Sequence, residues 1–247
     1  GEFEMRVNYG QSVHGEAEIA AVVEVLRSST QMGARTRLMQ QRVAALFGKR
    51  HGIMVNSGSS ANYLAVELLD LPAGSEVITP ALTFATTVAP IVRKGLVPAF
   101  VDAAEATYNI DVPAIERMIT PRTRAMMIPS LIGNLPDWDE IRAIGDRHGL
   151  VVIEDSCDTL GATLRGTSTG NRSHISTTSF YGSHVITAAG NGGMICVNDD
   201  DLARKALLLR SWGRTSSLFE QSESIENRFG VKLDGIDYDA KFVFDEL

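Results

Sequence analysis

The sequence is poor in cysteine and contains no long apolar run. Cys157 and Cys196 are its two cysteines, too few for a disulfide framework or a thiolate metal cage. Both stand in apolar, strand-like text that is typical of buried residues. No hydrophobic stretch approaches the ~20 residues of a membrane-spanning helix, and residues 1–5 are acidic, without the apolar core of a signal peptide. These features predict a protein of a reducing, cytoplasmic compartment with no metal site.

Positive charge is also in deficit. The chain has 23 Lys and Arg against 30 Asp and Glu, which gives a net charge of −7. Such a surface does not attract nucleic acid or anionic lipid. We therefore expect neither nucleic acid nor a membrane among its partners.

The sequence does contain a regular alternation of short apolar runs and segments whose apolar residues have a helical period. The runs that predict strands are 52–55, 76–79, 97–101, 124–128, 150–153, 177–180 and 193–197. The helical segments are two helices within 15–48, then 61–69, 86–94, 139–148 and 200–209. This alternation predicts an α/β fold with a mostly parallel, seven-stranded sheet between helices. We expect an N-terminal arm over 1–14, in which 1–4 resemble a cloning scar, one large domain over 15–213, and a polar excursion over 214–247.

Ligands of such sheets gather beyond the carboxyl ends of the strands, where four clusters stand. In the first, Asn56 to Ala61, small residues lead into a helix whose amides could bind a phosphate; a simple N-cap is the alternative. In the second, Phe84 could stack on a flat ring, or it could be a core residue. In the third, Asp155 ends a buried strand and needs a partner. That partner is either a protonated pyridine nitrogen, as for pyridoxal phosphate, or a structural arginine.

The fourth cluster runs from Ser179 to His184 and is followed by the glycine pair 192–193. A turn of this kind commonly carries a lysine that anchors an aldehyde cofactor. An imidazole cannot form that lasting bond, but it transfers protons near neutral pH. Ser179 could donate to a phosphate, and His184 would then face the reacting carbon. A structural histidine is the alternative, although the order of the four clusters suits one ligand.

The order and the residues of these segments resemble the DegT/DnrJ/EryC1/StrS family of pyridoxal-phosphate sugar aminotransferases. This family has the type I (aspartate aminotransferase) fold. The segments that carry the resemblance are 57–62, 80–87, 153–161, 179–193 and 209–214. The resemblance runs from about residue 9 to the end of the chain. It implies a homodimer with its sites at the interface. It also implies a smaller C-terminal domain, before which this chain looks truncated.

Within that family, the chain is most similar to the nucleotide-sugar 3-dehydratases, which carry histidine in place of the Schiff-base lysine. The shared features are Ser-Phe-Tyr-x-x-His over 179–184, Ile-Thr at 186–187, Asp158 three residues after Asp155, Trp-Gly-Arg over 212–214, and Tyr238-Asp239-x-Lys241. The resemblance implies that Ser59, Ser60 and Ser179 hold the phosphate. Phe84 would cover one ring face, Asp155 would bind the pyridinium, and Asp158 would belong to the cofactor site. His184 would be the catalytic acid and base.

The implied cofactor is pyridoxamine phosphate, formed from pyridoxal phosphate, and the implied substrate is a nucleotide-linked 4-keto-6-deoxyhexose. The cofactor amine would condense with the C4 ketone, His184 would remove a proton from the cofactor methylene carbon, and the C3 hydroxyl would leave. Glutamate would restore the amine. The stretch 215–220 has no cysteine, so we do not expect the iron–sulfur cluster of another branch. The nucleotide, the sugar and the pathway, lipopolysaccharide O-antigen or antibiotic deoxysugar, stay open.

Two residues depart from the dehydratase pattern. Asn191 stands where those enzymes have a glutamate between glycines, and Ser130 stands where they have a histidine before the Gly-Asn motif. Two alternatives therefore remain. One is another reaction on a nucleotide-linked keto sugar, such as epimerisation or half-transamination. The other is a catalytically silent homologue that acts as a binding partner.

Overall fold

The computed structural model describes residues 7–8, 10–28 and 30–213. The expected excursion over 214–247, Arg214, the cysteine-free stretch 215–220 and the Tyr-Asp-x-Lys motif lie outside the described residues, as do residues 1–4. Within the described part, no helix is long and apolar enough to cross a membrane.

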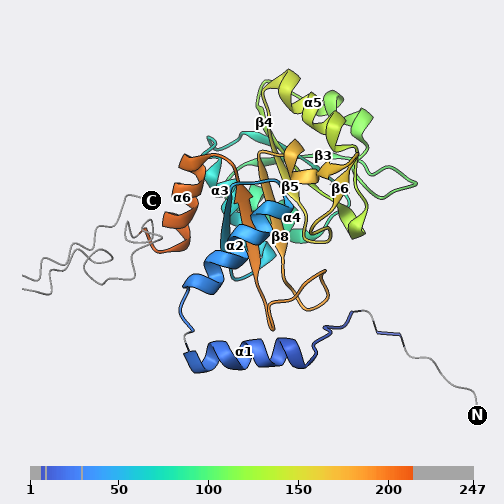
Figure 1. Cartoon of the computed structure of the whole chain (residues 1–247). Helices are drawn as coiled ribbons and strands as arrows, with labels where there is room; N and C mark the ends of the chain where they lie inside the picture. The colour runs from blue at the N-terminus through green and yellow to red at the C-terminus, as the bar shows by residue number, and fades with distance from the viewer. Residues whose placement is uncertain (1–6, 9, 29, 214–247) are drawn as a thin grey trace, which may run out of the picture.

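Seven strands form the main sheet, in the order β1-β9-β8-β5-β4-β2-β3 (Figure 1). β9 is antiparallel to its neighbours β1 and β8, and the remaining pairs are parallel. The strands are β1 (His51–Val55), β2 (Glu76–Pro80), β3 (Val97–Val101), β4 (Thr123–Pro129), β5 (Val151–Asp155), β8 (Ile175–Ser179) and β9 (Gly193–Val197). The predicted seven-stranded, mostly parallel sheet is thus confirmed. The sequence reading missed a short hairpin, β6 (Thr163–Leu164) and β7 (Thr167–Ser168), whose strands are too short to carry an apolar pattern.

The helices follow the predicted segments within a few residues. They are α1 (Glu16–Ser28), α2 (Ala34–Leu46), α3 (Gly58–Leu68), α4 (Ala85–Arg93), α5 (Trp138–His148) and α6 (Asp200–Arg210). Alternate residues of the strands point to opposite faces, so the sheet has two cores. On one face Ile153 and Ile195 pack with side chains of α3, α4 and α6. On the other, Val152 packs against α5, and Cys196 packs against α2. The result is three layers, with helices on both faces of the sheet.

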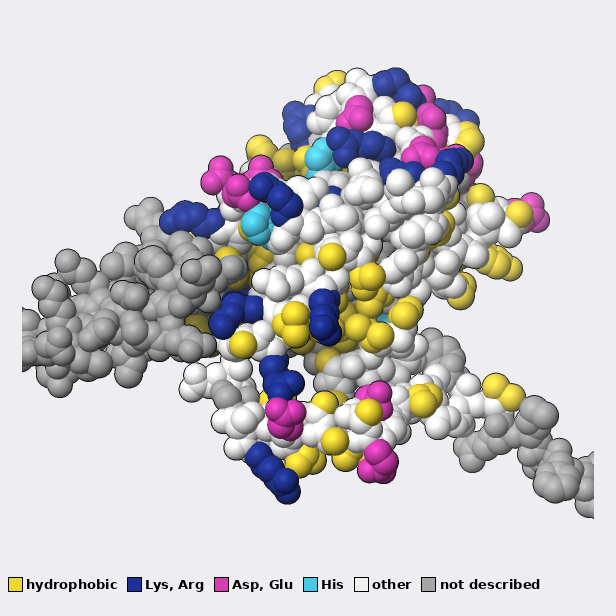
Figure 2. Space-filling model, viewed as in Figure 1, with side chains coloured by type: hydrophobic (Ala, Val, Ile, Leu, Met, Phe, Trp, Pro, Cys, Tyr) yellow, Lys and Arg dark blue, Asp and Glu magenta, His cyan; other side chains and the backbone are white. Residues whose placement is uncertain are grey.

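Helix α1 lies apart from these layers in Figure 1. None of its described residues is buried. Its apolar residues Ile19, Val22 and Leu26 are exposed, and Figure 2 shows apolar side chains along this helix. The helix therefore takes no part in the core of the domain.

Candidate active site

The predicted functional segments meet at one edge of the main sheet. β1, β2, β5 and β8 all point the same way, so their carboxyl ends share this edge. The segments that follow them are 56–61 after β1, 81–84 after β2, 155–158 at the end of β5 and 179–184 at the end of β8. This is the edge at which open α/β sheets bind ligands.

Asp155 ends β5 with a side chain that is nearly buried, at 6% exposure. Its Oδ2 accepts hydrogen bonds from Asn62 Nδ2 at 2.9 Å and from Thr87 Oγ1 at 3.0 Å. Its Oδ1 accepts from the backbone N–H of Cys157 at 3.2 Å. These donors are all neutral, so they orient the carboxylate without cancelling its charge. A ligand cation at this edge would complete the pairing that a buried charge requires.

Asn62 and Thr87 were not found from the sequence. Both are buried, and Asn62 Oδ1 also accepts a hydrogen bond from Thr177 Oγ1 at 2.6 Å. Each stands in the first two turns of a helix that directly follows a strand. Asn62 and Thr87 are the last residues of the segments 57–62 and 80–87 that carry the family resemblance, and this is the signal that could have revealed them.

Small residues form a cradle at the N-terminus of α3. Ser57 caps the helix by accepting from the backbone N–H of Ser60 at 3.0 Å, so the N-cap alternative holds for Ser57. A Cβ on Gly58 would lie 2.6 Å from Cβ of Ser179 and 2.8 Å from Sγ of Cys157. Glycine is therefore required for the end of β8 to approach the helix. The free amides and the helix dipole at this point favour an anion.

The three serines assigned to the phosphate stand around this cradle. Ser60 Oγ accepts from Ser57 Oγ at 3.1 Å, and Ser179 Oγ accepts from the backbone N–H of Tyr181 at 3.2 Å. Both hydroxyls keep their own hydrogen for an anionic ligand. Ser59 Oγ donates to Thr86 Oγ1 at 3.3 Å, a weaker bond that an anion could replace.

Phe84 precedes α4 as its N-cap residue and is 69% exposed. The core alternative is thus wrong for this ring. The phenyl group stands outside the packed layers, where it can cover a flat ligand.

His184 lies in the turn between β8 and β9 and is 22% exposed in its side chain. Its Nε2 is 3.5 Å from Oδ1 of Asp158, and its Nδ1 is buried without a hydrogen-bond partner. The edge of the Tyr181 ring meets the imidazole at a centroid distance of 5.7 Å. Buried structural polar groups are normally paired. Nδ1 is instead enclosed by the protein, as are the unpartnered hydroxyls of Thr79, Thr159 and Thr169, and Nε2 is the nitrogen that faces another polar side chain.

The two cysteines have separate surroundings. Cys196 is buried in β9 as expected, whereas Cys157 lies in the turn after β5 and is only partly buried. Burial, together with the Asp155 carboxylate, raises the pKa of the Cys157 thiol well above its ordinary value. The thiol therefore stays protonated at neutral pH, and its part is to pack against Gly58 rather than to act as a nucleophile. Among the described residues, no three His, Cys, Asp or Glu side chains form a candidate metal site.

Ser130, one of the two departures from the dehydratase pattern, is buried. Its Oγ accepts a hydrogen bond from Nε1 of Trp138 at 3.2 Å, and its backbone N–H donates to the carbonyl of Asp155 at 3.0 Å. The hydroxyl is therefore fixed in the core of the domain. Its role here is to hold β4 against the end of β5.

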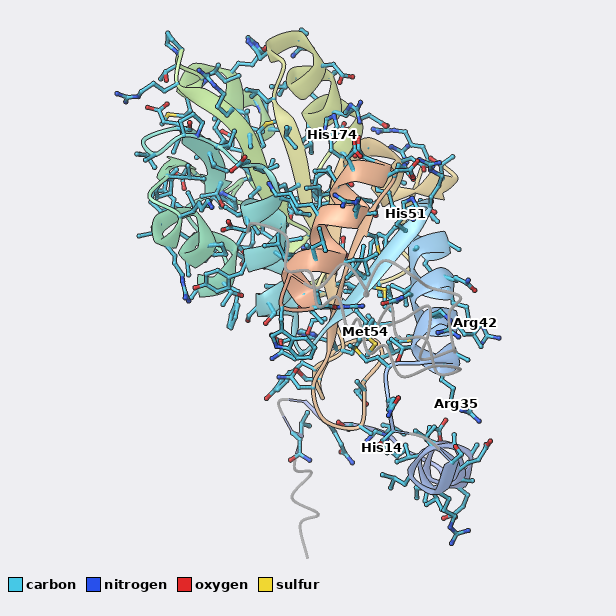
Figure 3. All side chains as sticks on the ribbon, turned by 90° about the vertical axis from the view of Figure 1, so that its left-hand side faces the viewer. His14, Arg35, Arg42, His51, Met54 and His174 are labelled. Atoms are coloured by element: carbon cyan, nitrogen blue, oxygen red, sulfur yellow. The ribbon has the colours of Figure 1, made fainter. Side chains whose placement is uncertain are left out.

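A groove of about 940 Å³ opens beside the cradle, on the side of α3 that faces α6. Its lining includes Ser60, Tyr63, Arg93, Asn191 and Trp212. Figure 3 views this side of the molecule, with Met54 of the groove wall at the end of β1. Neither Asp155 nor His184 lines this groove. It therefore adjoins the candidate site without containing the predicted pyridinium partner or the predicted acid and base.

Comparison with known proteins places this geometry in a family. The family model of the DegT/DnrJ/EryC1/StrS aminotransferase family matches residues 13–237. A dTDP-4-dehydro-2,6-dideoxy-D-glucose 3-dehydratase from Saccharopolyspora spinosa is 40% identical over 213 residues, which cover 83% of this chain and 46% of that protein. A GDP-perosamine synthase from Caulobacter vibrioides is 42% identical over 166 residues, which cover 67% of this chain and 44% of that protein. This chain spans about half the length of these relatives.

Solved structures show the same fold. The E. coli GDP-4-keto-6-deoxy-D-mannose-3-dehydratase with bound hydrated PLP superposes with a TM-score of 0.81 at 31% identity. The match covers 87% of this chain and 57% of that one. The expected type I transferase fold is confirmed, and the chain belongs to the DegT/DnrJ/EryC1/StrS aminotransferase family.

Proposed function

We propose that this chain carries the cofactor site of an enzyme that removes the C3 hydroxyl of a nucleotide-linked 4-keto-6-deoxyhexose with pyridoxamine phosphate. The observation that carries the proposal is His184. It stands in the turn after β8, where a cofactor-anchoring lysine is expected, and its Nδ1 has no partner in the described structure. A protein without that lysine leaves the cofactor unattached, so the cofactor can act in its amine form.

The residues at the sheet edge fit this cofactor. Asp155 presents a carboxylate that has only neutral partners and suits a protonated pyridine nitrogen. Phe84, which follows β2 at the same sheet edge, is exposed and suits a ring face. The cradle at Gly58, whose space a Cβ would fill, suits a phosphate held by Ser59, Ser60 and Ser179.

Pyridoxamine phosphate supplies, when bound, an amine that condenses with a ketone and a ring that accepts an electron pair. The protein's part is proton transfer and orientation. His184 would take a proton from the cofactor methylene carbon and return it to the departing hydroxyl oxygen. Asp155 would keep the pyridine nitrogen protonated, because its negative charge favours that form.

The substrate class is inferred from the relatives. Those named above are a dTDP-sugar 3-dehydratase, a GDP-perosamine synthase and a GDP-sugar 3-dehydratase. Each of these relatives is named for a nucleotide-linked sugar, which supports that class here. A dehydratase structure with a trapped PLP-glutamate geminal diamine supports glutamate as the amino donor. We place the protein in deoxysugar biosynthesis and infer that it acts as a homodimer in the cytoplasm.

A half-transamination is the second candidate, because the identity to the perosamine synthase is as high as that to the dehydratase. The two reactions differ in product mass. The chain is incubated with pyridoxamine phosphate and a nucleotide-linked 4-keto-6-deoxyhexose, and the products are examined by mass spectrometry. Dehydration followed by loss of the cofactor amine replaces the C3 hydroxyl with hydrogen, so the sugar loses one oxygen atom. A sugar that keeps all its hydroxyls and gains an amine would favour the second candidate, and no cofactor binding would favour a silent homologue.

A further inference from the structure

The carboxylate of Asp158 joins two segments that are distant in the sequence. Its Oδ1 lies 3.5 Å from Nε2 of His184, and its Oδ2 accepts a hydrogen bond from the backbone N–H of Ile132 at 3.1 Å. The Asp158 side chain is 40% exposed, against 22% for His184. One carboxylate oxygen is thus fixed by the backbone, and the other is turned toward the imidazole.

The backbone at Ile132 is strained, and its amide is held by Asp158. Ile132 has φ 57° and ψ 24°, in the left-handed region, and Gly133 follows with φ 84°. This conformation is a genuine outlier for a β-branched residue. The Ile132 side chain is 73% exposed, so burial of that side chain does not account for the strain. The hydrogen bond of its amide to Asp158 does, and strain of this kind is concentrated at functional sites.

The two nitrogens of the His184 ring have different surroundings. Nε2 faces the Asp158 carboxylate, Nδ1 is buried without a partner, and the Tyr181 ring edge touches the imidazole at an interplanar angle of 68°. A buried N–H without an acceptor is costly. A proton on Nε2, toward the carboxylate, avoids that cost and leaves Nδ1 with its lone pair.

We propose that Asp158 is a positioning residue that fixes the orientation and tautomer of His184, beyond any contact with the cofactor. Its effect on turnover rests on the function proposed above, whereas its effect on the ring does not. The backbone amide in the strained turn at Ile132 fixes the Asp158 carboxylate. The carboxylate in turn favours the His184 tautomer with its proton on Nε2, so each turnover starts from this tautomer. His184 then transfers the proton and Asp158 orients its ring, as in other sites where a carboxylate orients a catalytic imidazole.

The test uses the 247-residue chain labelled with ¹⁵N-histidine. Five histidines give signals, and His184→Asn identifies the one that belongs to His184. Long-range ¹H–¹⁵N spectra above the pH of imidazole protonation show which nitrogen carries the proton. We expect Nε2–H in the parent chain and a mixture of tautomers in Asp158→Asn. Asp70→Asn, which alters an exposed aspartate elsewhere, should leave the His184 signals unchanged.

Two further measurements separate positioning from cofactor contact. The affinity for pyridoxamine phosphate, measured by fluorescence titration, should stay within about twofold in Asp158→Asn. Turnover should fall on the order of tenfold with little change in KM, which is part of what an acid–base group contributes. A weaker affinity with unchanged His184 signals would overturn the proposal, because Asp158 would then be a cofactor contact only.

The spectra need no substrate, so they test Asp158 even if the dehydration fails. Conversely, sugar deoxygenation by a variant with an unchanged tautomer pattern would reject the positioning role and leave the proposed function intact. Asp158→Ser is a second variant, should Asp158→Asn fail to fold. It removes the same carboxylate, and the same mixture of tautomers is expected.

Discussion

Thr87 Oγ1 donates a hydrogen bond to Asp155 Oδ2 at 3.0 Å and so ties the start of α4 to the end of β5. Asn62 Nδ2 donates to the same oxygen from α3. Two helices therefore fix one carboxylate at the sheet edge. The direction in which Asp155 points is set by α3 and α4, outside the strand that carries it.

Thr87→Val should weaken cofactor binding without abolishing it. The variant keeps the shape of the side chain but removes one of three donors to the Asp155 carboxylate. We expect a loss of about 1.5–3 kcal/mol in the free energy of unfolding, the usual range for a hydrogen bond to a charged group. The affinity for pyridoxamine phosphate should fall severalfold. Urea unfolding and fluorescence titration measure the two effects. Thr83→Val, which loses only the hydroxyl bonded to Thr87 Oγ1, is the matched control, and equal losses in both variants would contradict this reading.

Gly58→Ala should disturb the cradle more than its single methyl group suggests. The new Cβ would lie 2.6 Å from Cβ of Ser179, a distance that side chains do not adopt. The end of β8 must then move away from α3. We expect a loss of about 1–3 kcal/mol in stability, as for overpacking, and a larger loss of affinity for inorganic phosphate. Gly33→Ala is the control, because its Cβ would meet its nearest atom at an ordinary 3.8 Å. Unchanged phosphate affinity in Gly58→Ala would show that the cradle does not bind the phosphate.

His184→Asn should retain pyridoxamine phosphate and lose turnover by about 10²–10⁴-fold, the range of general acid–base catalysis. The amide occupies similar space but transfers no proton. His184→Lys should instead hold pyridoxal phosphate covalently, as a coloured protein that borohydride reduction fixes. Absorbance and mass spectrometry of the intact chain report both results. Full turnover by His184→Asn would refute the role assigned to the imidazole.

The sheet could be predicted from the sequence because its strands are short apolar runs between turn residues. All seven main strands and six helices follow those runs within a few residues. Asp155 and His184 could be proposed from the sequence because each carries a polar or reactive side chain just after such a run. The hairpin β6–β7 was missed, since strands of two residues carry no periodicity.

Other parts of the site depend on tertiary contacts that no local pattern encodes. Asn62 and Thr87 reach Asp155 from 93 and 68 residues away in the sequence. Ile132 stands directly before Gly133 and Asn134, but nothing in its residue type predicts its left-handed backbone. Its conformation becomes understandable only when the Asp158 carboxylate is seen to accept its amide hydrogen.

Ile132→Gly should stabilise the chain. A β-branched residue in the left-handed region costs about 1–2 kcal/mol, and glycine accepts that conformation freely at an entropic cost of ~0.5–1 kcal/mol. The side chain is mostly exposed, so little burial is lost. We expect a net gain of about 0.5–1 kcal/mol in urea unfolding, with the amide still bound to Asp158. Leu131→Gly, at a neighbouring position outside the left-handed region, should destabilise instead. A loss of stability in Ile132→Gly would show that the turn is not strained.

Stability should fall in mild acid because of His174 at the start of β8. Its Nδ1 accepts a hydrogen bond from the backbone N–H of Val152 at 2.9 Å, which joins β8 to β5. Burial, and then the charges of Arg142 and Lys49, lower the pKa of His174 below its usual 6.5. The unfolded chain therefore binds this proton first as the pH falls. The stabilising contribution is complete above pH 6.5 and is lost as the pH falls from 6.5 through the lower folded pKa.

The comparison that isolates this group is His174→Asn, whose side-chain oxygen can take the place of Nδ1 but does not titrate. The free energies of unfolding of the parent chain and the variant are measured by urea denaturation between pH 7.5 and pH 5. Their difference should be constant above pH 6.5. Below pH 6.5 the parent chain should lose stability relative to the variant. Other titrating groups are common to both chains and cancel in this difference. A difference that stays flat over the whole range would mean that the Val152 hydrogen bond survives protonation, which a doubly protonated imidazole cannot allow.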